Sequence, residues 1–301
     1  MSAGASDERG IRTGGRFHGR VAVVTGAGNG LGRGSALRLS QEGARVVVVD
    51  IDEAAARRTA AELPGEALAV AADVAVEDAT ERWDAAAVEA FGRVDLYHLN
   101  AGIFGTFAPL PDLTVEEFDR VQAVNVRGQF LGLRAAFRRF RAQGGGGAIV
   151  LTASIASLTG SADLLAYQTS KHATLGLLRG AAMYGGPLGV RVNAVAPGIV
   201  PTDLFAAAAG TVGGKNDMEL RASTTPLRRA GTPADIAAVT AFLLSDDAAY
   251  MTGQVVSADG GASVVNTVRP SGGAGAWPAR EHDQALYGTA VPSADTETSH
   301  E

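Results

Sequence analysis

A phenol, an ammonium group and a hydroxyl stand in this sequence at spacings that suit proton transfer at an alcohol or carbonyl oxygen. Tyr167 and Lys171 are four residues apart in a helical pattern, so their side chains share one helical face. A free tyrosine titrates near pH 10, and a cation within about 4–6 Å lowers its pKa towards the range where it can act as a base. Ser154 lies thirteen residues before Tyr167. Because tyrosine and lysine at this spacing are common, the surrounding elements decide whether they form a site.

A glycine-rich segment near the start of the chain joins a β-branched run to a helical pattern. Its sequence is Thr25-Gly26-Ala27-Gly28-Asn29-Gly30-Leu31-Gly32. At such a junction the backbone can approach a pyrophosphate, and the unpaired N–H groups and dipole of the helix favour negative charge. A tight turn is the alternative interpretation, but strand, loop and helix occur in the order that a dinucleotide-binding unit requires.

An acidic residue, Asp50, ends the second apolar run, at roughly the 20-residue distance where a carboxylate reaches the adenosine ribose of a dinucleotide. Its charge would repel a 2′-phosphate, and neither Asn29 nor Ile51 offsets it. The sequence therefore predicts NAD rather than NADP, with an ordinary strand-end turn as the alternative. Asp73 and Val74, after the third run, are candidates for contact with the adenine ring or for a simple turn.

Seven short β-branched runs alternate with helical patterns such as Glu77–Phe91. The runs are Val21–Thr25, Arg45–Val49, Ala67–Ala71, Val94–Leu99, Ala148–Leu151, Val190–Val195 and Gln254–Ser257. Near-continuous apolar runs are typical of parallel strands covered on both faces. We therefore expect an α/β fold, a single doubly wound Rossmann-type domain with a central parallel seven-stranded sheet and helices on both faces. Ser154 would then lie at the carboxyl edge of the sheet, where ligands bind.

The composition excludes several classes of protein. The 301 residues include no cysteine, which rules out disulfides, thiolate nucleophiles and cysteine-ligated metals. A formal net charge of −6 argues against nucleic-acid binding, and no apolar run approaches the roughly 18 residues of a membrane span. Residues 1–18 lack the apolar core of a secretory signal, so we expect a cytoplasmic protein.

Glycine is the enriched residue, at 39 positions, and part of that excess lies at the two ends of the chain. We expect residues 1–18 to be a flexible leader, 19–267 to be the Rossmann-fold domain that holds both the cofactor and substrate sites, and 268–301 to be a C-terminal extension. That extension is expected to be flexible or packed on a neighbouring subunit.

With these residues the sequence resembles the short-chain dehydrogenase/reductase family over about residues 19–265. The ordered pattern consists of Thr25-Gly26-x-x-x-Gly30-x-Gly32, Asn100-Ala101-Gly102, Asn125, Ser154, Tyr167, Lys171, Pro197-Gly198, Thr202 and Asp259-Gly260-Gly261. No single motif decides, whereas the ordered set is highly specific. One departure is Leu99, which stands where such families often carry a second asparagine. We expect it to cost one structural hydrogen bond.

The resemblance implies a role for each matching residue. Tyr167 would be the general acid/base, Ser154 would hydrogen-bond the substrate oxygen, and Lys171 would bind the nicotinamide ribose and lower the tyrosine pKa. Asn125, expected in a long helix, would hold a water in a proton relay. The implied cofactor contacts are Thr25, Gly26, Asn29, Gly30, Leu31, Gly32, Asp50, Asp73, Val74, Asn100, Ala101, Gly102, Tyr167, Lys171, Pro197, Gly198, Val200 and Thr202. No metal site is expected.

The resemblance further implies an NAD-dependent oxidoreductase that interconverts a secondary alcohol and a ketone and forms a homo-oligomer, a tetramer or a dimer. Apolar residues flank the catalytic groups in sequence and favour a hydrophobic small-molecule substrate; they are Phe104, Ile155, Leu158, Leu164, Leu165 and Ile199. Two other classes stay open. A non-catalytic dinucleotide sensor or scaffold of the same fold would bind the cofactor without turnover, and a methyltransferase would bind S-adenosylmethionine instead.

Overall fold

The computed structural model describes residues 15–161, 164–202 and 222–265, and within them strands alternate with helices. Seven parallel strands form one sheet in the order β3-β2-β1-β4-β5-β6-β7. This is the predicted doubly wound α/β architecture. The strands are β1 Val21–Thr25, β2 Arg45–Asp50, β3 Ala67–Ala71, β4 Leu96–Leu99, β5 Gly147–Thr152, β6 Val190–Pro197 and β7 Val255–Ala258.

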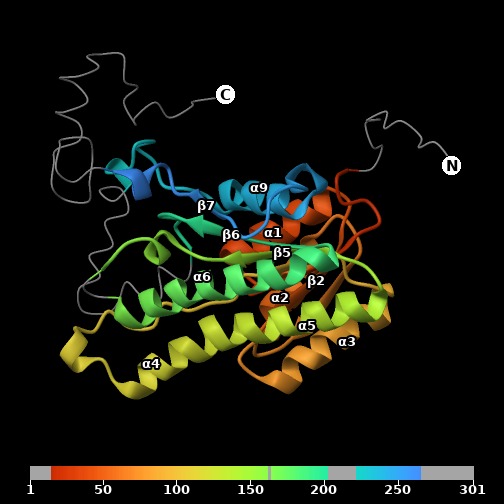
Figure 1. Cartoon of the computed structure of the whole chain (residues 1–301), viewed down its shortest axis with the longest axis horizontal. Helices are drawn as coiled ribbons and strands as arrows, with labels where there is room; N and C mark the ends of the chain where they lie inside the picture. Colours follow the sequence, from red (N-terminus) through yellow and green to blue (C-terminus); the bar gives the residue numbers. More distant parts are fainter. Residues whose placement is uncertain (1–14, 162–163, 203–221, 266–301) are drawn as a thin grey trace, which may run out of the picture.

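Helices cover both faces of the sheet (Figure 1). The main helices are α1 Gly30–Gln41, α2 Glu53–Glu62, α3 Glu77–Phe91, α4 Val115–Gln122, α5 Gly128–Gln143, α6 Leu165–Gly185 and α9 Pro233–Leu244. One apolar core lies between the sheet and α3, α5 and α6, and a second lies between the sheet and α1, α2 and α9. Six of these helices therefore have an apolar side against the sheet, whereas α4 packs against α6.

The central strands show why a parallel sheet forms. Val46 to Val49 in β2 are all fully buried, and they alternate between the two cores. A strand that is apolar on both sides has to be covered on both sides, and right-handed strand–helix–strand connections provide that cover. At about 1.5–3 kcal/mol for each fully buried valine, this layer is a large share of the hydrophobic stabilisation.

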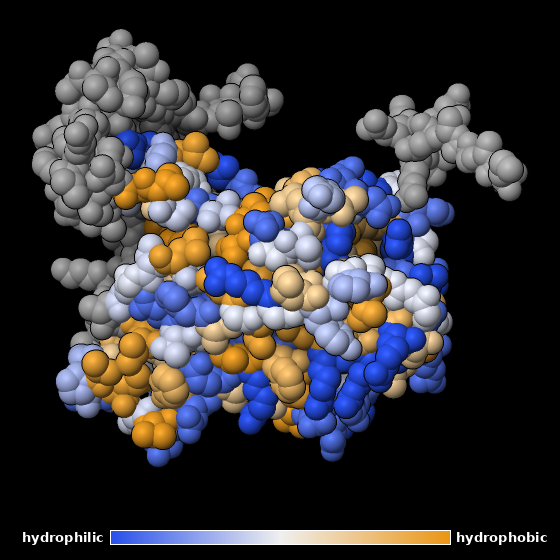
Figure 2. Space-filling model, in the orientation of Figure 1, coloured by the Kyte–Doolittle hydropathy of each residue, from blue (hydrophilic) through white to orange (hydrophobic). Residues whose placement is uncertain are grey.

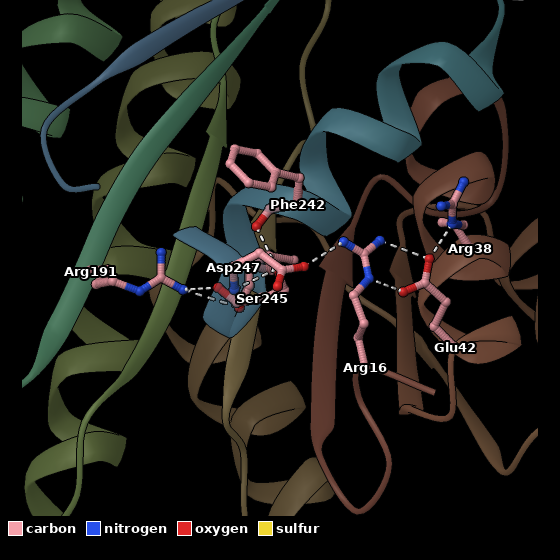
Figure 3. A network of polar contacts seen from close by, with 8 residues as sticks. Arg16, Arg38, Glu42, Arg191, Phe242, Ser245 and Asp247 are labelled. Atoms are coloured by element: carbon pink, nitrogen blue, oxygen red, sulfur yellow. Dashed lines mark hydrogen bonds and ion pairs between the residues drawn. The ribbon is translucent and has the colours of Figure 1, made fainter. Parts of the chain in front are cut away.

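The start of the described chain is packed against the domain. Phe17 is buried in the second core. Arg16 binds the Glu42 carboxylate with two nitrogens and reaches Asp247 at 3.4 Å, so it links the end of α1 to the turn after α9 (Figure 3). The expected flexible leader of residues 1–18 is therefore wrong for residues 15–18, which belong to the domain.

The other predicted end segments, residues 1–14 and the extension from 268, lie outside the described residues. None of the helices in the described ranges combines the length and the apolar character that crossing a membrane requires.

Candidate active site

A cavity of about 500 Å³ lies where β1, β4, β5 and β6 end. Seventeen of the predicted site residues line it: Gly26, Asn29, Gly30, Leu31, Asp50, Asp73, Val74, Asn100, Ala101, Gly102, Ser154, Tyr167, Lys171, Pro197, Gly198, Val200 and Thr202. The other three, Thr25, Gly32 and Asn125, contact these lining residues from behind. Residues spread over most of the sequence thus meet at one edge of the sheet.

The glycine loop forms a cradle that side chains would fill. Gly26 and Gly30 have φ values of +63° and +53°, in the left-handed region that favours glycine. A Cβ on Gly32 would lie 2.0 Å from the carbonyl oxygen of Gly26, so α1 can start this close to β1 only without a side chain there. The first residues of α1 line the cavity, and their N–H groups have no partner within the helix. The loop therefore fits an anionic group such as a pyrophosphate.

Asp50 holds one end of the cavity from the last position of β2. Its Oδ2 accepts a hydrogen bond from the Gly28 backbone N–H at 2.8 Å, and its Oδ1 accepts one from Asp52 at 3.0 Å. Among the described lining residues the only other charged ones are Asp73 and Lys171, so this end has no arginine that could bind a 2′-phosphate. Asp73 also accepts from the Ala75 N–H at 2.8 Å, which makes it a turn residue as well as a lining residue.

Thr25 and Asn100 join the glycine loop to the end of β4. The Thr25 hydroxyl accepts from the Asn100 and Ala101 N–H groups at 3.0 and 3.2 Å. In return, the Asn100 amide donates to the carbonyls of Thr25 and Gly26 at 3.1 and 3.2 Å. These bonds fix the distance between the loop and the middle of the cavity.

Leu99 replaces the expected asparagine by apolar packing. It is buried beside Leu151 of the neighbouring strand β5. A Cβ on Gly132 of α5 would come within 2.7 Å of the Leu99 side chain, so the glycine makes room for the leucine. The departure from the family pattern is thus accommodated in the core and lies outside the cavity lining.

The hydroxyl groups of Ser154 and Tyr167 are hydrogen-bonded to each other. Ser154 caps the short turn Ile155–Ser157, and its Oγ accepts from the Ala156 N–H at 3.1 Å. The Tyr167 ring lies in the first turn of α6, with its centroid 4.4 Å from that of Phe104. Burial raises the pKa of Tyr167 to about 12, although the Ser154 bond acts in the opposite direction. Tyr167 is therefore protonated near neutral pH.

Lys171 is not among the groups that shift the pKa of Tyr167 in this structure, so its expected effect on the tyrosine stays a prediction. Its Nζ lies 5.5 Å from the centroid of the Tyr167 ring and donates to the Thr152 carbonyl at 2.8 Å. Burial also lowers the pKa of Lys171 to about 8. Desolvation disfavours the charged forms of both groups, which raises the pKa of the phenol and lowers that of the ammonium.

Asn125 lies in the expected long helical stretch, which runs through α4 and α5, at a π-helical turn, Ala123–Arg127, between them. Its Oδ1 accepts from the Ile103 N–H at 2.8 Å, and its Nδ2 donates to the Ile103 carbonyl and the Ser170 hydroxyl, both at 2.9 Å. Protein groups therefore use both donors of the amide. A relay water at this position could bind only acceptors, namely the second lone pair of Oδ1 or a backbone carbonyl of the turn.

The remaining part of the cavity is apolar. Its lining includes Ile103, Phe104, Ile155, Leu164 and Ile199. Of the apolar residues predicted to flank the catalytic groups, Leu158 and Leu165 are less than half exposed at the surface and do not line the cavity. Among the described residues, no group of three or more histidine or acidic side chains is placed to hold a metal ion.

Two polar residues at the cavity are not among the predicted site residues: Thr152 lines the cavity, and His98 lies beneath it. His98 is fully buried in β4, and its Nε2 lies 2.9 Å from the hydroxyl oxygen of Thr152, the last residue of β5. The sequence does mark them, because each is a polar side chain in a largely apolar strand. Neither belongs to one of the ordered motifs, so the motifs do not predict them as site residues.

Comparison with known proteins agrees with this geometry. A family profile described as enoyl-(acyl carrier protein) reductase matches residues 26–263. Levodione reductase of Leifsonia aquatica is 40% identical over 258 residues, covering 82% of this chain and 96% of that protein. Cyclohexanol dehydrogenase of Acinetobacter sp. (strain SE19) is 38% identical, covering 81% of this chain and 95% of its own length.

The fold is also similar to that of solved reductase structures. A 3-ketoacyl-(acyl-carrier-protein) reductase from Brucella melitensis, determined in complex with NADH, superposes with a TM-score of 0.76 at 35% identity. The match covers 82% of this chain and 99% of that one.

Proposed function

The chain belongs to the short-chain dehydrogenase/reductase family, whose enzymes interconvert alcohols and carbonyl compounds, and we propose that this member uses NAD(H) to interconvert a hydrophobic secondary alcohol and its ketone. The observation that carries the proposal is the meeting of Ser154, Tyr167 and Lys171 in one cavity with the glycine loop and Asp50. A sensor without catalysis has no need of the first three residues. Methyl transfer from S-adenosylmethionine gives no reason for Ser154, Tyr167 and Lys171 to lie together either.

The residues present fit a dinucleotide. The glycine loop would hold the pyrophosphate, Asp50 the adenosine ribose, and Lys171 the nicotinamide ribose. Thr202, whose side chain lies 3.4 Å from a Cβ built on Gly30, would contact the nicotinamide end. When bound, the nicotinamide accepts or supplies the hydride. The Asp50 carboxylate, with no arginine among the described lining residues beside it, supports NAD over NADP.

Tyr167 and Ser154 would handle the proton and the substrate oxygen. Because the pKa of Tyr167 is about 12, its hydroxyl is protonated near neutral pH and can act as a general acid on a ketone oxygen held by Ser154. The reverse reaction needs the phenolate, which forms more readily as the pH rises. The proposal therefore includes a reduction that is efficient near neutrality and an alcohol oxidation whose rate increases with pH.

The decisive test is a panel of cyclic and open-chain ketones and secondary alcohols, assayed with NAD(H) by NADH absorbance. Tyr167→Phe should lower kcat by at least about 1,000-fold while leaving NAD binding nearly intact, because only the acid/base hydroxyl is lost. Ser154→Thr keeps a hydroxyl and serves as the matched control for Ser154→Ala. An active Tyr167→Phe variant would overturn the mechanism, and cofactor binding without turnover on any substrate would favour the sensor.

A homo-oligomer is the second part of the proposal. An apolar groove of about 840 Å³ lies between α5 and α6 on the outer side of these helices. Phe130, Tyr184 and Leu188 line it and are about half exposed or more. Over the region of α5 and α6, apolar residues reach the surface between charged ones (Figure 2). Exposed apolar surface of this kind supports association with a second copy of the chain.

A further inference from the structure

His98 is buried beneath the cavity with a single polar contact. It lies in β4 and is fully inaccessible to solvent, and its Nε2 is 2.9 Å from the Thr152 hydroxyl oxygen. Its Nδ1 has no hydrogen-bond partner among the described residues. Burying an imidazole with only one hydrogen-bond partner lowers the stability of the fold, which suggests that His98 has a role in the site.

The direction of each hydrogen bond follows from the donors available. The Asn100 Nδ2 donates to the carbonyls of Thr25 and Gly26, so its Oδ1 is an acceptor. Thr152 donates its one hydroxyl proton to that Oδ1 at 3.0 Å. The Thr152 oxygen must then accept from His98, whose Nε2 carries the proton and whose Nδ1 is bare. A single ordered chain thus runs from His98 through Thr152 and Asn100 to the glycine loop.

We propose that His98 is a positioning residue for the cofactor loop: its Nε2–H fixes the Thr152 hydroxyl, which in turn orients the Asn100 amide against the Gly26 carbonyl. Without this donor the Thr152 hydroxyl is free to rotate away from the Asn100 Oδ1, and the amide then keeps only its two bonds to the carbonyls of Thr25 and Gly26. The inference rests on the proposed function only in taking NAD as the ligand of the loop.

Two further observations support this role. The Thr152 carbonyl accepts from Lys171 at 2.8 Å and from Gln129 at 3.2 Å, so the same residue also anchors the lysine of the site. Burial lowers the pKa of His98 to about 3, which keeps the imidazole neutral and the chain of donors unchanged over the working range of pH. The device is therefore a fixed brace that does not respond to physiological pH.

The test measures NAD binding by calorimetry with the full-length protein and three variants. His98→Leu removes the donor at similar volume, His98→Gln keeps an N–H donor, and Thr240→Val is the control, because it removes a buried hydroxyl that has no partner among the described residues. We expect the Kd for NAD to rise about tenfold in His98→Leu. It should return to within about threefold of wild type in His98→Gln and stay unchanged in Thr240→Val. Leu and Gln variants that bind NAD equally would overturn the proposal.

Thr152 provides a second route if His98→Leu does not fold. Thr152→Ser keeps the hydroxyl and should bind NAD normally, whereas Thr152→Val should weaken binding as His98→Leu does. The double variant His98→Leu/Thr152→Val should be no weaker than Thr152→Val alone, since both act through one chain of bonds. Fully additive losses would contradict this.

Nitrogen NMR of ¹⁵N-histidine-labelled wild type tests the proton order directly, with His98→Gln used to assign the signal. We expect a protonated Nε2 and a bare Nδ1 that do not titrate between pH 5 and 8, and the opposite tautomer would overturn the chain of donors. Failure of the wild type to bind NAD, with this tautomer present, would instead count against the proposed cofactor.

Discussion

Tyr167 and Lys171 are both enclosed by protein, and burial moves their pKa values in opposite directions. It raises that of Tyr167 to about 12 and lowers that of Lys171 to about 8. A lysine whose folded pKa lies below its ordinary value holds its proton less tightly in the folded chain than in the unfolded chain. Below pH 8 the buried ammonium therefore costs stability, and the cost disappears as the pH rises towards 10.5, where the unfolded lysine also loses its proton.

Lys171→Met should for this reason unfold at higher urea concentration than wild type near neutral pH. At about 1.4 kcal/mol per pH unit, the gain in the free energy of unfolding is on the order of 3 kcal/mol. It should shrink towards zero as the pH rises from 8 to 10.5. The Thr152 carbonyl keeps Gln129 as a donor, so the substitution leaves no buried acceptor unpaired.

The chain makes a direct control possible, because Lys171 and Lys215 are its only lysines. Carbon NMR of ¹³C-lysine-labelled protein gives two titration curves, and the one missing in Lys171→Met belongs to Lys171. A Lys171 signal that titrates at or above 10.5 would show that the ammonium is not destabilised, and the predicted stability difference would fail with it.

At the scale of elements, the end of β2 and the glycine loop define the cofactor together. A Cβ on Gly28 would lie 2.9 Å from the Asp50 Oδ2 and 2.7 Å from the Ala55 Cβ, so a basic side chain at position 28 is incompatible with this carboxylate. Ile51, by contrast, is 73% exposed and lines the cavity, which makes it the place where a positive charge can be added without repacking.

Asp50→Asn/Ile51→Arg should therefore shift the preference from NAD towards NADP. Asparagine removes the repelling charge while its oxygen can still accept from Gly28, and the arginine can bind a 2′-phosphate. We expect the ratio of kcat/KM for NAD over NADP to fall by at least about 100-fold, or roughly 3 kcal/mol. Ile51→Arg alone is the control and should keep NAD preference. Wild type that already prefers NADP would refute the interpretation of Asp50.

The elements themselves were largely legible from the sequence, because β-branched runs and helical spacing are local signals. All seven strands lie within two residues of their predicted bounds, and Glu77–Phe91 is the helix α3. The π-helical turn at Asn125 was not legible, since its amide partners Ile103 and Ser170 are distant in sequence. The close packing of Gly146 was not legible either, since a Cβ there would lie 2.0 Å from the carbonyl oxygen of Gly189, which is distant in sequence.

For the site, the sequence predicted which residues come together but not the pKa values of their side chains. Motif residues that line the cavity were found by their order, whereas pKa values depend on burial, which no spacing reveals. Burial raises the pKa of Tyr167, whereas the sequence had suggested a lowered value. His98 and Thr152 were not predicted as site residues because their hydrogen bond joins two strands that are distant in sequence.

At the scale of the whole molecule, α6 connects the site to the groove between α5 and α6. Its first turns carry Tyr167 and Lys171, and its later turns carry Gly176 and Gly180, where an added Cβ would meet no atom within 4 Å. A substitution at Gly180 therefore leaves the folded protomer unstrained and acts on whatever packs against the groove. Glycine inside a helix is also unfavourable, so a longer side chain should not lower helix stability.

Gly180→Glu should dissociate the assembly that wild type forms through this groove, because a carboxylate in an apolar contact is desolvated without a partner. Light scattering after gel filtration should give a smaller mass for this variant, while Val115→Glu, at a 70% exposed position on α4, should keep the wild-type mass.

The dissociated Gly180→Glu protomer should still bind NAD. Ser170 and Thr174 tie the first half of α6 to Asn125 and Gln129 within the same protomer, so the site does not depend on the partner to hold Lys171 in place. A variant that keeps the wild-type mass would place the interface elsewhere, and one that dissociates and loses NAD affinity would show that these internal bonds are too weak to hold the site alone.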